Sequence, residues 1–246
     1  MYQMRVNSAM LEDGLSYPVR GDWIGRIIIG GVLGFLSVLL LPAFVIVGYL
    51  VRVLEQTIAG EEVPPEFDDW GDLLMKGVIG SVITIAYTVI PVIVYAVVVA
   101  VVGGTSGAVG GDAGALIGVV GVLLALAFIP VLFLIYYAVP AALSAYAARG
   151  EIGAAFDLDL LKPALFSTEY LVAVLMPIVV AVVIWIVTAV LAITVVGILL
   201  LPFVQFYGQV AVFRMFGSAF ASVNSRIDAG SPGNASGAVG GDDIAY

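Results

Sequence analysis

The chain has 246 residues, of which 62% are hydrophobic and only 11% are charged, and its mean hydropathy is +1.17. Soluble domains are about half apolar and a quarter charged, so this composition excludes an ordinary soluble domain and indicates an integral membrane protein. The 18 acidic residues outnumber the 9 basic ones, giving a net charge of −9, which argues against binding nucleic acid or anionic lipid through charge.

The residue types that are missing narrow the chemistry further. The chain has no Cys and no His, so it lacks a thiolate nucleophile and the commonest general base and metal ligand. It also has no serine in a G-x-S-x-G elbow and no phosphate-binding loop of the G-x-x-x-x-G-K type. We therefore expect no enzymatic activity, no cofactor and no metal ion.

The chain divides into three parts. Residues 1–21 form a polar N-terminal lead, which lacks the basic start and apolar core of a cleavable signal peptide. Residues 22–223 form a membrane helical domain, and residues 224–246 are a Gly/Ser-rich acidic tail that we expect to be disordered. The apolar runs predict membrane spans at approximately 24–40, 42–57, 72–102, 113–149, 168–192 and 195–222.

The first apolar block, residues 24–53, is ambiguous. As one helix it would rise roughly 45 Å, against about 30 Å of hydrocarbon, and Pro42 interrupts it. If Pro42 marks a turn, the chain makes three helical hairpins and six spans, and all nine basic residues lie on one side, which the positive-inside rule makes cytoplasmic. If the block is a single kinked span, Arg26 and Arg52 lie on opposite sides and the total is five.

Two similar segments favour the hairpin plan. Leu39–Val53 and Leu199–Met215 share a leucine triplet, a proline, a Gly/Tyr pair and a later arginine. We therefore favour an all-α polytopic membrane bundle of six spans, with both termini cytoplasmic in the cell membrane, and keep five spans as the alternative.

The connectors carry further signals. The Gly-rich segment 103–112 predicts a flexible turn, and Gly150 is typical of a helix C-cap. In the connector 151–169, apolar residues between 152 and 160 fall near helical spacing, which predicts a short helix in the membrane interface.

The longest polar segment between apolar blocks begins at Glu61 and is strongly acidic. Asp69 is suited to begin the following helix, and Trp70 is suited to the membrane–water boundary. The spacing of its carboxylates matches no calcium loop, so we interpret the segment as a cytoplasmic loop that binds a partner. Its candidate residues are Glu61, Glu62, Glu66, Asp68, Asp69, Trp70 and Asp72.

The last span carries polar side chains. Gln205 and Gln209 lie one turn apart with Tyr207 between them, so they could line a path or bond across helices. No charged residue falls near the middle of a predicted span, which disfavours an ion-coupled transporter. A ladder of glycines at helical spacing predicts close helix packing, within the chain or in self-association: Gly110, Gly114, Gly118, Gly121 and, in the first block, Gly30 and Gly34.

Several motifs resemble one family. These are the segments Leu11–Pro18, Asp22-Trp23, Gly30-Gly31, Pro42, Gly48–Arg52, Gly60-Glu61, Pro65–Leu73 and Pro202–Tyr207. Together they are similar to the archaeal membrane proteins of domain of unknown function 4013, over roughly residues 11–222. The resemblance implies an integral membrane protein, carries over no catalytic residues, and agrees with a salt-loving source because many members come from such archaea.

These observations predict a non-enzymatic membrane scaffold or accessory subunit, embedded in the lipid bilayer, whose loops meet a cytoplasmic protein partner. The alternative is a facilitative permease or channel for a small neutral solute, with Gln205, Tyr207 and Gln209 along the path.

Overall fold

The computed structural model describes residues 2–230, apart from the side chains of residues 2–8, 169, 173 and 226–230. Within these residues the chain is all helix and connecting loop, without a strand, as the apolar runs predict. The elements are α1 (Tyr2–Ser16), η1 (Tyr17–Val19), α2 (Trp23–Phe35), η2 (Leu36–Leu39), α3 (Leu41–Ile58), α4 (Trp70–Val109), α5 (Gly111–Arg149), η3 (Ile152–Phe156), α6 (Leu158–Leu165), α7 (Thr168–Leu191) and α8 (Val195–Gly230).

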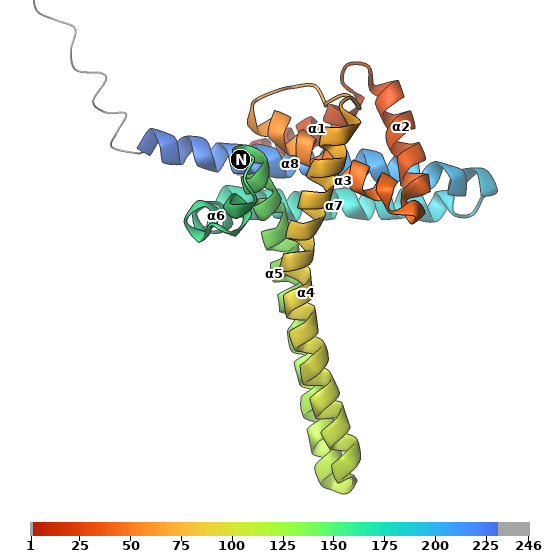
Figure 1. Ribbon diagram of the computed structural model, residues 1–246, viewed down its shortest axis with the longest axis vertical. Helices are drawn as coiled ribbons and strands as arrows, with labels where there is room; N and C mark the ends of the chain where they lie inside the picture. The colour runs from red at the N-terminus through yellow and green to blue at the C-terminus, as the bar shows by residue number, and fades with distance from the viewer. Residues whose placement is uncertain (1, 231–246) are drawn as a thin grey trace, which may run out of the picture.

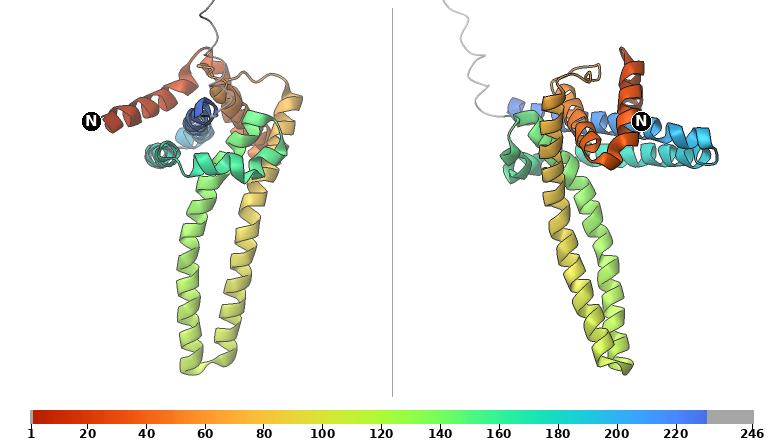
Figure 2. Two further views of the ribbon diagram at one scale, coloured as in Figure 1. Left: turned by 90° about the vertical axis from the view of Figure 1, so that its left-hand side faces the viewer. Right: turned by 45° about the vertical axis from the view of Figure 1, so that its right-hand side comes forward.

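Helices α4 and α5 form a long antiparallel stem that projects from a compact head (Figures 1 and 2). They have 40 and 39 residues, so each rises roughly 60 Å, about twice the hydrocarbon thickness of a bilayer. Apart from Gly114 near the tip, their buried residues lie at the head ends, between Leu73 and Ile83 in α4 and between Pro140 and Tyr146 in α5. The remaining stem surface is apolar and exposed, as a lipid-facing surface must be.

The predicted flexible turn over residues 103–112 is wrong in extent. Helix α4 continues to Val109, and the reversal is confined to Gly110 and Gly111, whose positive φ values of 61° and 57° suit glycine. Close packing explains the longer helix, because a Cβ added at Gly114 would lie 2.5 Å from the backbone oxygen of Ser106. Such contact between α4 and α5 offsets the low helix propensity of glycine, which costs about 1 kcal/mol per residue.

The first apolar block is broken where Pro42 suggested. After α2, the short helix η2 leads to Leu40, which has a φ of 63°, and Pro42 lies in the first turn of α3, where proline is tolerated. The six-span arrangement of three hairpins is nevertheless not confirmed. Helix α2 has 13 residues, about 20 Å, too short to cross a bilayer alone, and it packs mainly against α8.

Five described helices are long and apolar enough to cross a membrane: α3, α4, α5, α7 and α8. A sixth candidate arises only if Ala9–Val19 and Trp23–Leu39, which meet at a bend of 85°, are counted together. The α7–α8 pair runs crosswise to the stem (Figure 1). The candidate helices therefore share no common axis. If the stem lies along the normal of a flat bilayer, α7 and α8 are strongly tilted in the same bilayer.

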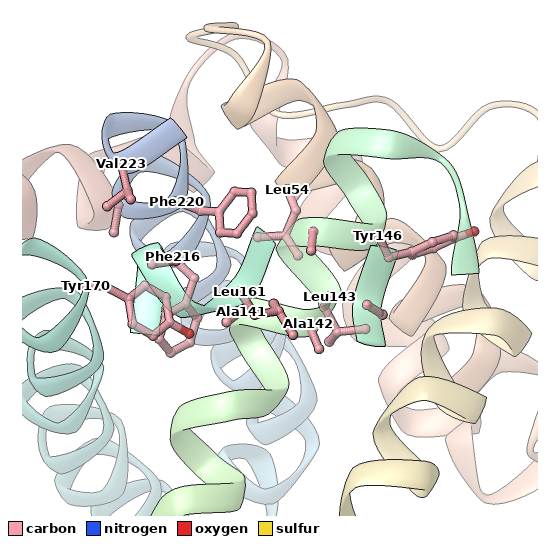
Figure 3. Packing of buried hydrophobic residues seen from close by; sticks show 14 of the residues in the cluster. Leu54, Ala141, Ala142, Leu143, Tyr146, Leu161, Tyr170, Phe216, Phe220 and Val223 are labelled. Carbon is pink, nitrogen blue, oxygen red and sulfur yellow. The ribbon is translucent and has the colours of Figure 1, made fainter. Parts of the chain in front are cut away.

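The larger buried cluster holds the base of the stem against α6, α7 and α8 (Figure 3). The alanine-rich end of α5, which includes Ala141 and Ala142, lies against Leu161 of α6, Tyr170 of α7 and Phe220 of α8. A second cluster surrounds the start of the chain and α3 and includes Tyr17, Tyr49, Leu73 and Phe206. The two clusters together join residues of α3, α4, α5, α6, α7 and α8 in the head.

Two glycines allow α3 and α4 to touch backbone to backbone. A Cβ at Gly48 would lie 1.8 Å from the carbonyl oxygen of Leu73, and one at Gly77 would lie 1.7 Å from that of Phe44. Both distances are far below van der Waals contact, so no larger residue fits either position. Small residues that admit such close approach are characteristic of helix pairs in membranes.

The connectors and ends follow the sequence in part. The predicted interfacial segment 152–160 forms η3 and the start of α6, and Gly150 ends α5 with a φ of 70°, which confirms its role as a C-cap. The polar lead is helical and lies against α8. Helix α8 continues to Gly230, past the predicted boundary at residue 223, and residues 231–246 of the predicted tail lie outside the described residues.

Candidate functional site: the acidic loop

The segment Gly60–Asp69 joins α3 to α4 without forming a helix of its own. Gly60 begins it with a φ of 88°, and Asp69 ends it, also at positive φ. The side chain of Asp69 accepts from the backbone N–H of Asp72 at 3.3 Å, which confirms the predicted N-cap of α4. We call residues 61–69 the acidic loop.

The backbone of the acidic loop is held by side chains from four other elements. Seven of the eight carbonyl oxygens from Glu61 to Asp68 accept a hydrogen bond from an arginine or a tyrosine; that of Phe67 is the exception among them. The donors are Arg214 to Glu61 (2.7 Å), Arg20 to Glu62 (3.2 Å), Tyr17 to Val63 (3.3 Å), Arg26 to Pro64, Tyr49 to Pro65 (2.9 Å), and Arg52 to Glu66 (3.4 Å) and Asp68 (3.1 Å). We call these six side chains the clamp.

Arg26 is the most buried arginine of the clamp, with 6% of its surface exposed. Its Nε donates to the carbonyl of Asp22 at 3.1 Å, and its two terminal nitrogens donate to the carbonyls of Pro64 and Arg20. No carboxylate of the described residues forms an ion pair with it, so backbone dipoles alone compensate its charge. The guanidinium therefore fixes the acidic loop to the start of α2 and to the turn that precedes it.

Aromatic rings hold the loop from within. Phe67 stacks on Tyr49 with ring centroids 4.2 Å apart, and it also meets Phe206 of α8 at 5.8 Å. Pro64 and Pro65 are buried. Trp70, which we expected at the membrane boundary, lies 6.0 Å from Phe67 and is about half exposed. The loop therefore has an apolar inner face continuous with the core.

Two of the carboxylates predicted to bind a partner, Asp68 in the loop and Asp72 in α4, form ion pairs within the chain. Arg52 bonds to Asp68 and, at 2.8 Å, to Asp72; Lys76 bonds to Asp72 at 2.9 Å and to Glu55 at 2.6 Å. This network connects the end of α3 to the start of α4. Asp68 and Asp72 therefore hold the two helices together at this end, although the side chain of Asp68 stays 73% exposed.

The remaining loop carboxylates face outward. Glu61, Glu62 and Glu66 are exposed, and their carboxylates have no hydrogen-bond or ion-pair partner among the described residues. In the part of the chain that the structure describes, no three acidic residues converge as metal ligands would. The clamped backbone thus displays three separate negative charges at fixed positions.

Asp13 of α1 ties the clamp to the N-terminal lead. It accepts from Arg20 Nη2 at 2.7 Å and from Arg214 Nε at 3.0 Å. Burial by itself raises the pKa of the Asp13 carboxyl, but the hydrogen bonds and charges of Arg214 and Arg20 outweigh it, so the pKa is lowered. Arg214 also lies over the ring of Tyr17, 4.5 Å from its centroid.

The second predicted group of residues lies on α8. Gln205 and Gln209 are both exposed on one face of the helix, where Gln205 donates to Thr188 of α7 at 3.2 Å. Tyr207 is not brought together with them, because its hydroxyl donates to the carbonyl of Leu15 in α1. The structure thus groups the two glutamines beside α7 and directs Tyr207 toward the N-terminal lead.

Sequence reasoning did not identify the clamp. The signal that could have found it was the charge pattern, since the arginines were predicted to gather on the side of the membrane that carries this loop. Four of them, Arg20, Arg26, Arg52 and Arg214, bond to the loop backbone. The predicted glycine faces are likewise used inside the chain: Gly30 lies against Phe206, Gly34 against Pro202, and Gly118 against Ser106.

The fold and the loop define a class of protein: a helical protein with five helices apolar enough to cross a membrane and a head closed by a clamped acidic loop. The chain belongs to the family described as protein of unknown function (DUF4013), whose model matches residues 35–193. The match takes in α3 to α7 and the acidic loop and is narrower than the expected 11–222. No curated protein matches the chain. No solved structure matches it either.

Proposed function

We propose that the protein is a non-enzymatic membrane scaffold or accessory subunit that presents the acidic loop to a basic segment of a cytoplasmic partner. The observation that carries this proposal is the clamp, which holds the loop backbone by seven carbonyls while Glu61, Glu62 and Glu66 point away from it. The connector that forms η3 and α6 is a second part of the proposed partner surface, because its Asp159 and Glu151 are exposed.

Pre-organisation is the physical reason to favour binding. Ordering a free loop on association costs about 1–2 kcal/mol of backbone entropy per residue, which a clamped loop has lost already on folding. Fixed carboxylates also raise the association rate of a positively charged partner and make it depend on salt. A loop that served only to connect two helices would not need six long side chains to hold it.

The charge distribution supports a cytoplasmic position for this face. The clamp arginines gather at the head, whereas Asp112 lies in the first turn of α5, at the far tip of the stem (Figure 1). Under the positive-inside rule the head then faces the cytoplasm of a cell whose membrane holds the apolar helices.

The proposal is tested with a fluorescent Lys/Arg-rich peptide and the full chain in lipid nanodiscs. The triple variant Glu61→Gln, Glu62→Gln, Glu66→Gln should weaken binding by about three-fold to a hundred-fold, since each exposed charge contributes roughly 0.2–1 kcal/mol and 1.4 kcal/mol is a factor of ten. The matched control replaces the same three residues by Asp, which keeps the charges. Equal affinity for the wild type and the Gln variant at low salt would exclude the loop as the docking surface.

A second candidate, a facilitative permease or channel for a small neutral solute, is favoured by cavities beside Gln205 and Gln209. One cavity of about 650 Å³ lies between α8 and α2–α3, and a second of about 310 Å³ lies between α8 and α7. Flux of a neutral solute such as glycerol into proteoliposomes would support this candidate if Gln209→Leu reduced it. Flux no faster than through empty liposomes would remove it.

A further inference from the structure

The two cavities beside α8 are separated by a single ridge. Gln205, Gln209 and Phe213 line both of them, and these residues are four positions apart, which places them on one face of the helix. The larger cavity is closed on its other side by α2 and α3, through residues such as Gly34 and Ile46, and the smaller one by α7. The arrangement is two parallel grooves with a polar crest between them.

The grooves are otherwise almost wholly apolar. Ser37, Thr188 and the indole N–H of Trp185 are their other polar groups. Ser37 donates to the carbonyl of Leu33, and Thr188 accepts from Gln205. The amide of Gln209 has no hydrogen-bond partner among the described residues, although it is exposed. The crest therefore carries an amide with unused donors and an unused acceptor in an apolar setting.

An amide facing hydrocarbon is unfavourable unless something hydrogen-bonds to it. Gln209 lies five residues before Arg214, about 7.5 Å along α8 from the charged head. A neutral group that accepts or donates a hydrogen bond at this position, attached to apolar material on both sides, would satisfy the crest and fill the grooves. Those are the features of the linkage region of a two-chain lipid.

We propose that α8 holds one bilayer lipid astride its crest, with one chain in each groove and the uncharged ester or ether oxygens between the chains accepting from Gln209. The occupant is a lipid because each groove is concave and apolar, and a small polar solute would leave that lining uncovered. A helix of a second copy would meet the crest as a ridge and could fill one groove only. The site is independent of the acidic loop.

The first experiment is a titration of the purified full chain in detergent micelles with dioleoyl phosphatidylcholine, followed by native mass spectrometry. We expect one lipid per wild-type chain. The dissociation constant of Gln209→Leu should be about three to fifteen times higher, which corresponds to the free energy of one interhelical hydrogen bond in a membrane. Thr105→Val on the exposed stem, whose hydroxyl bonds only within its own helix among the described residues, is the matched control and should bind as the wild type does.

The second experiment locates the chains. Trp185 lines the smaller groove, so with Trp23 and Trp70 replaced by Phe it reports a chain bound there. Dibrominated phosphatidylcholine at about one per chain should quench Trp185. The comparison variant carries Leu126→Trp at an exposed stem position, with all three native tryptophans replaced by Phe. Its fluorescence should be quenched only at higher ratios of lipid to protein.

Each remaining outcome overturns the proposal. Equal lipid affinity of wild type and Gln209→Leu, with unchanged thermal unfolding, would show that the amide holds no lipid. Equal quenching of the two reporter tryptophans would show ordinary lipid contact. A dimer that dissociates on Gln209→Leu would assign the crest to a second copy, and lysolipid binding as tightly as the two-chain lipid would exclude the paired grooves.

Discussion

Arg26→Met is the sharpest test of the clamp. The substitution keeps an unbranched apolar side chain of similar length but removes the donors that reach the carbonyls of Asp22, Pro64 and Arg20. The loop therefore loses its most buried arginine, while the residues that carry its exposed charge are untouched. A scaffold that depends on a pre-organised loop should be sensitive to this single change.

The size of the effect follows from the three lost bonds. The carbonyl of Pro64 is bonded in a buried position, and those of Asp22 and Arg20 in partly buried ones. A buried carbonyl left without a donor costs about 1–3 kcal/mol, but methionine also removes a guanidinium that was itself costly to bury, so the net loss is about 2–4 kcal/mol. At 1.4 kcal/mol per factor of ten, the fraction of molecules with an open loop should increase by a factor between about 30 and several hundred. The open-loop population of Arg26→Lys should lie between those of the wild type and Arg26→Met, since one ammonium cannot donate to three separately placed carbonyls.

The assay is cleavage by a glutamate-specific protease in nanodiscs, with mass spectrometry of cuts after Glu61, Glu62 and Glu66. When the loop opens and closes faster than it is cut, the cleavage rate follows the population of the open form. Arg149→Met, which removes an exposed arginine without an ion pair among the described residues, is the control. Wild-type cleavage of Arg26→Met at these three sites would refute the clamp as the restraint on the loop.

Two further predictions concern the packing of the head and its pH dependence. Gly48→Ala should destabilise the chain by about 1–3 kcal/mol or prevent its folding, because the new methyl would lie 1.8 Å from the carbonyl oxygen of Leu73. The control is Gly103→Ala, which has open space around it and should leave the temperature of thermal unfolding unchanged or slightly raised. Because the pKa of Asp13 is lowered in the fold, its bonds to Arg214 stabilise the chain above the unfolded pKa of a carboxyl, and this contribution should disappear as the pH falls through the folded pKa. Asp13→Asn should therefore lower the melting temperature at pH 7 and leave a smaller acid-induced decrease; parallel pH profiles for the two proteins would contradict the assignment.

Local and compositional signals predicted much of the fold. The stem and α7 came within a few residues of their observed bounds at most ends, because long apolar runs in a chain without central charges can satisfy their backbone only as helices. Asp69 and Gly150 were found because a cap depends on neighbours in the sequence. The exception was the Gly-rich segment before Gly110, where contact between α4 and α5 overrode local propensity.

Only the tertiary structure decided how the acidic loop is used and where the grooves lie. Arg214 and Glu61 are 153 positions apart, and Arg26 and Pro64 are 38 apart, so no local pattern indicates that these groups meet. Charge counting placed the arginines on one side of a membrane but could not direct them to backbone carbonyls, because that depends on how α2, α3 and α8 converge. The sequence by itself determined the solvent and the helices of this protein; the convergence of distant helices determined which polar groups are consumed in the fold and which are left for other molecules.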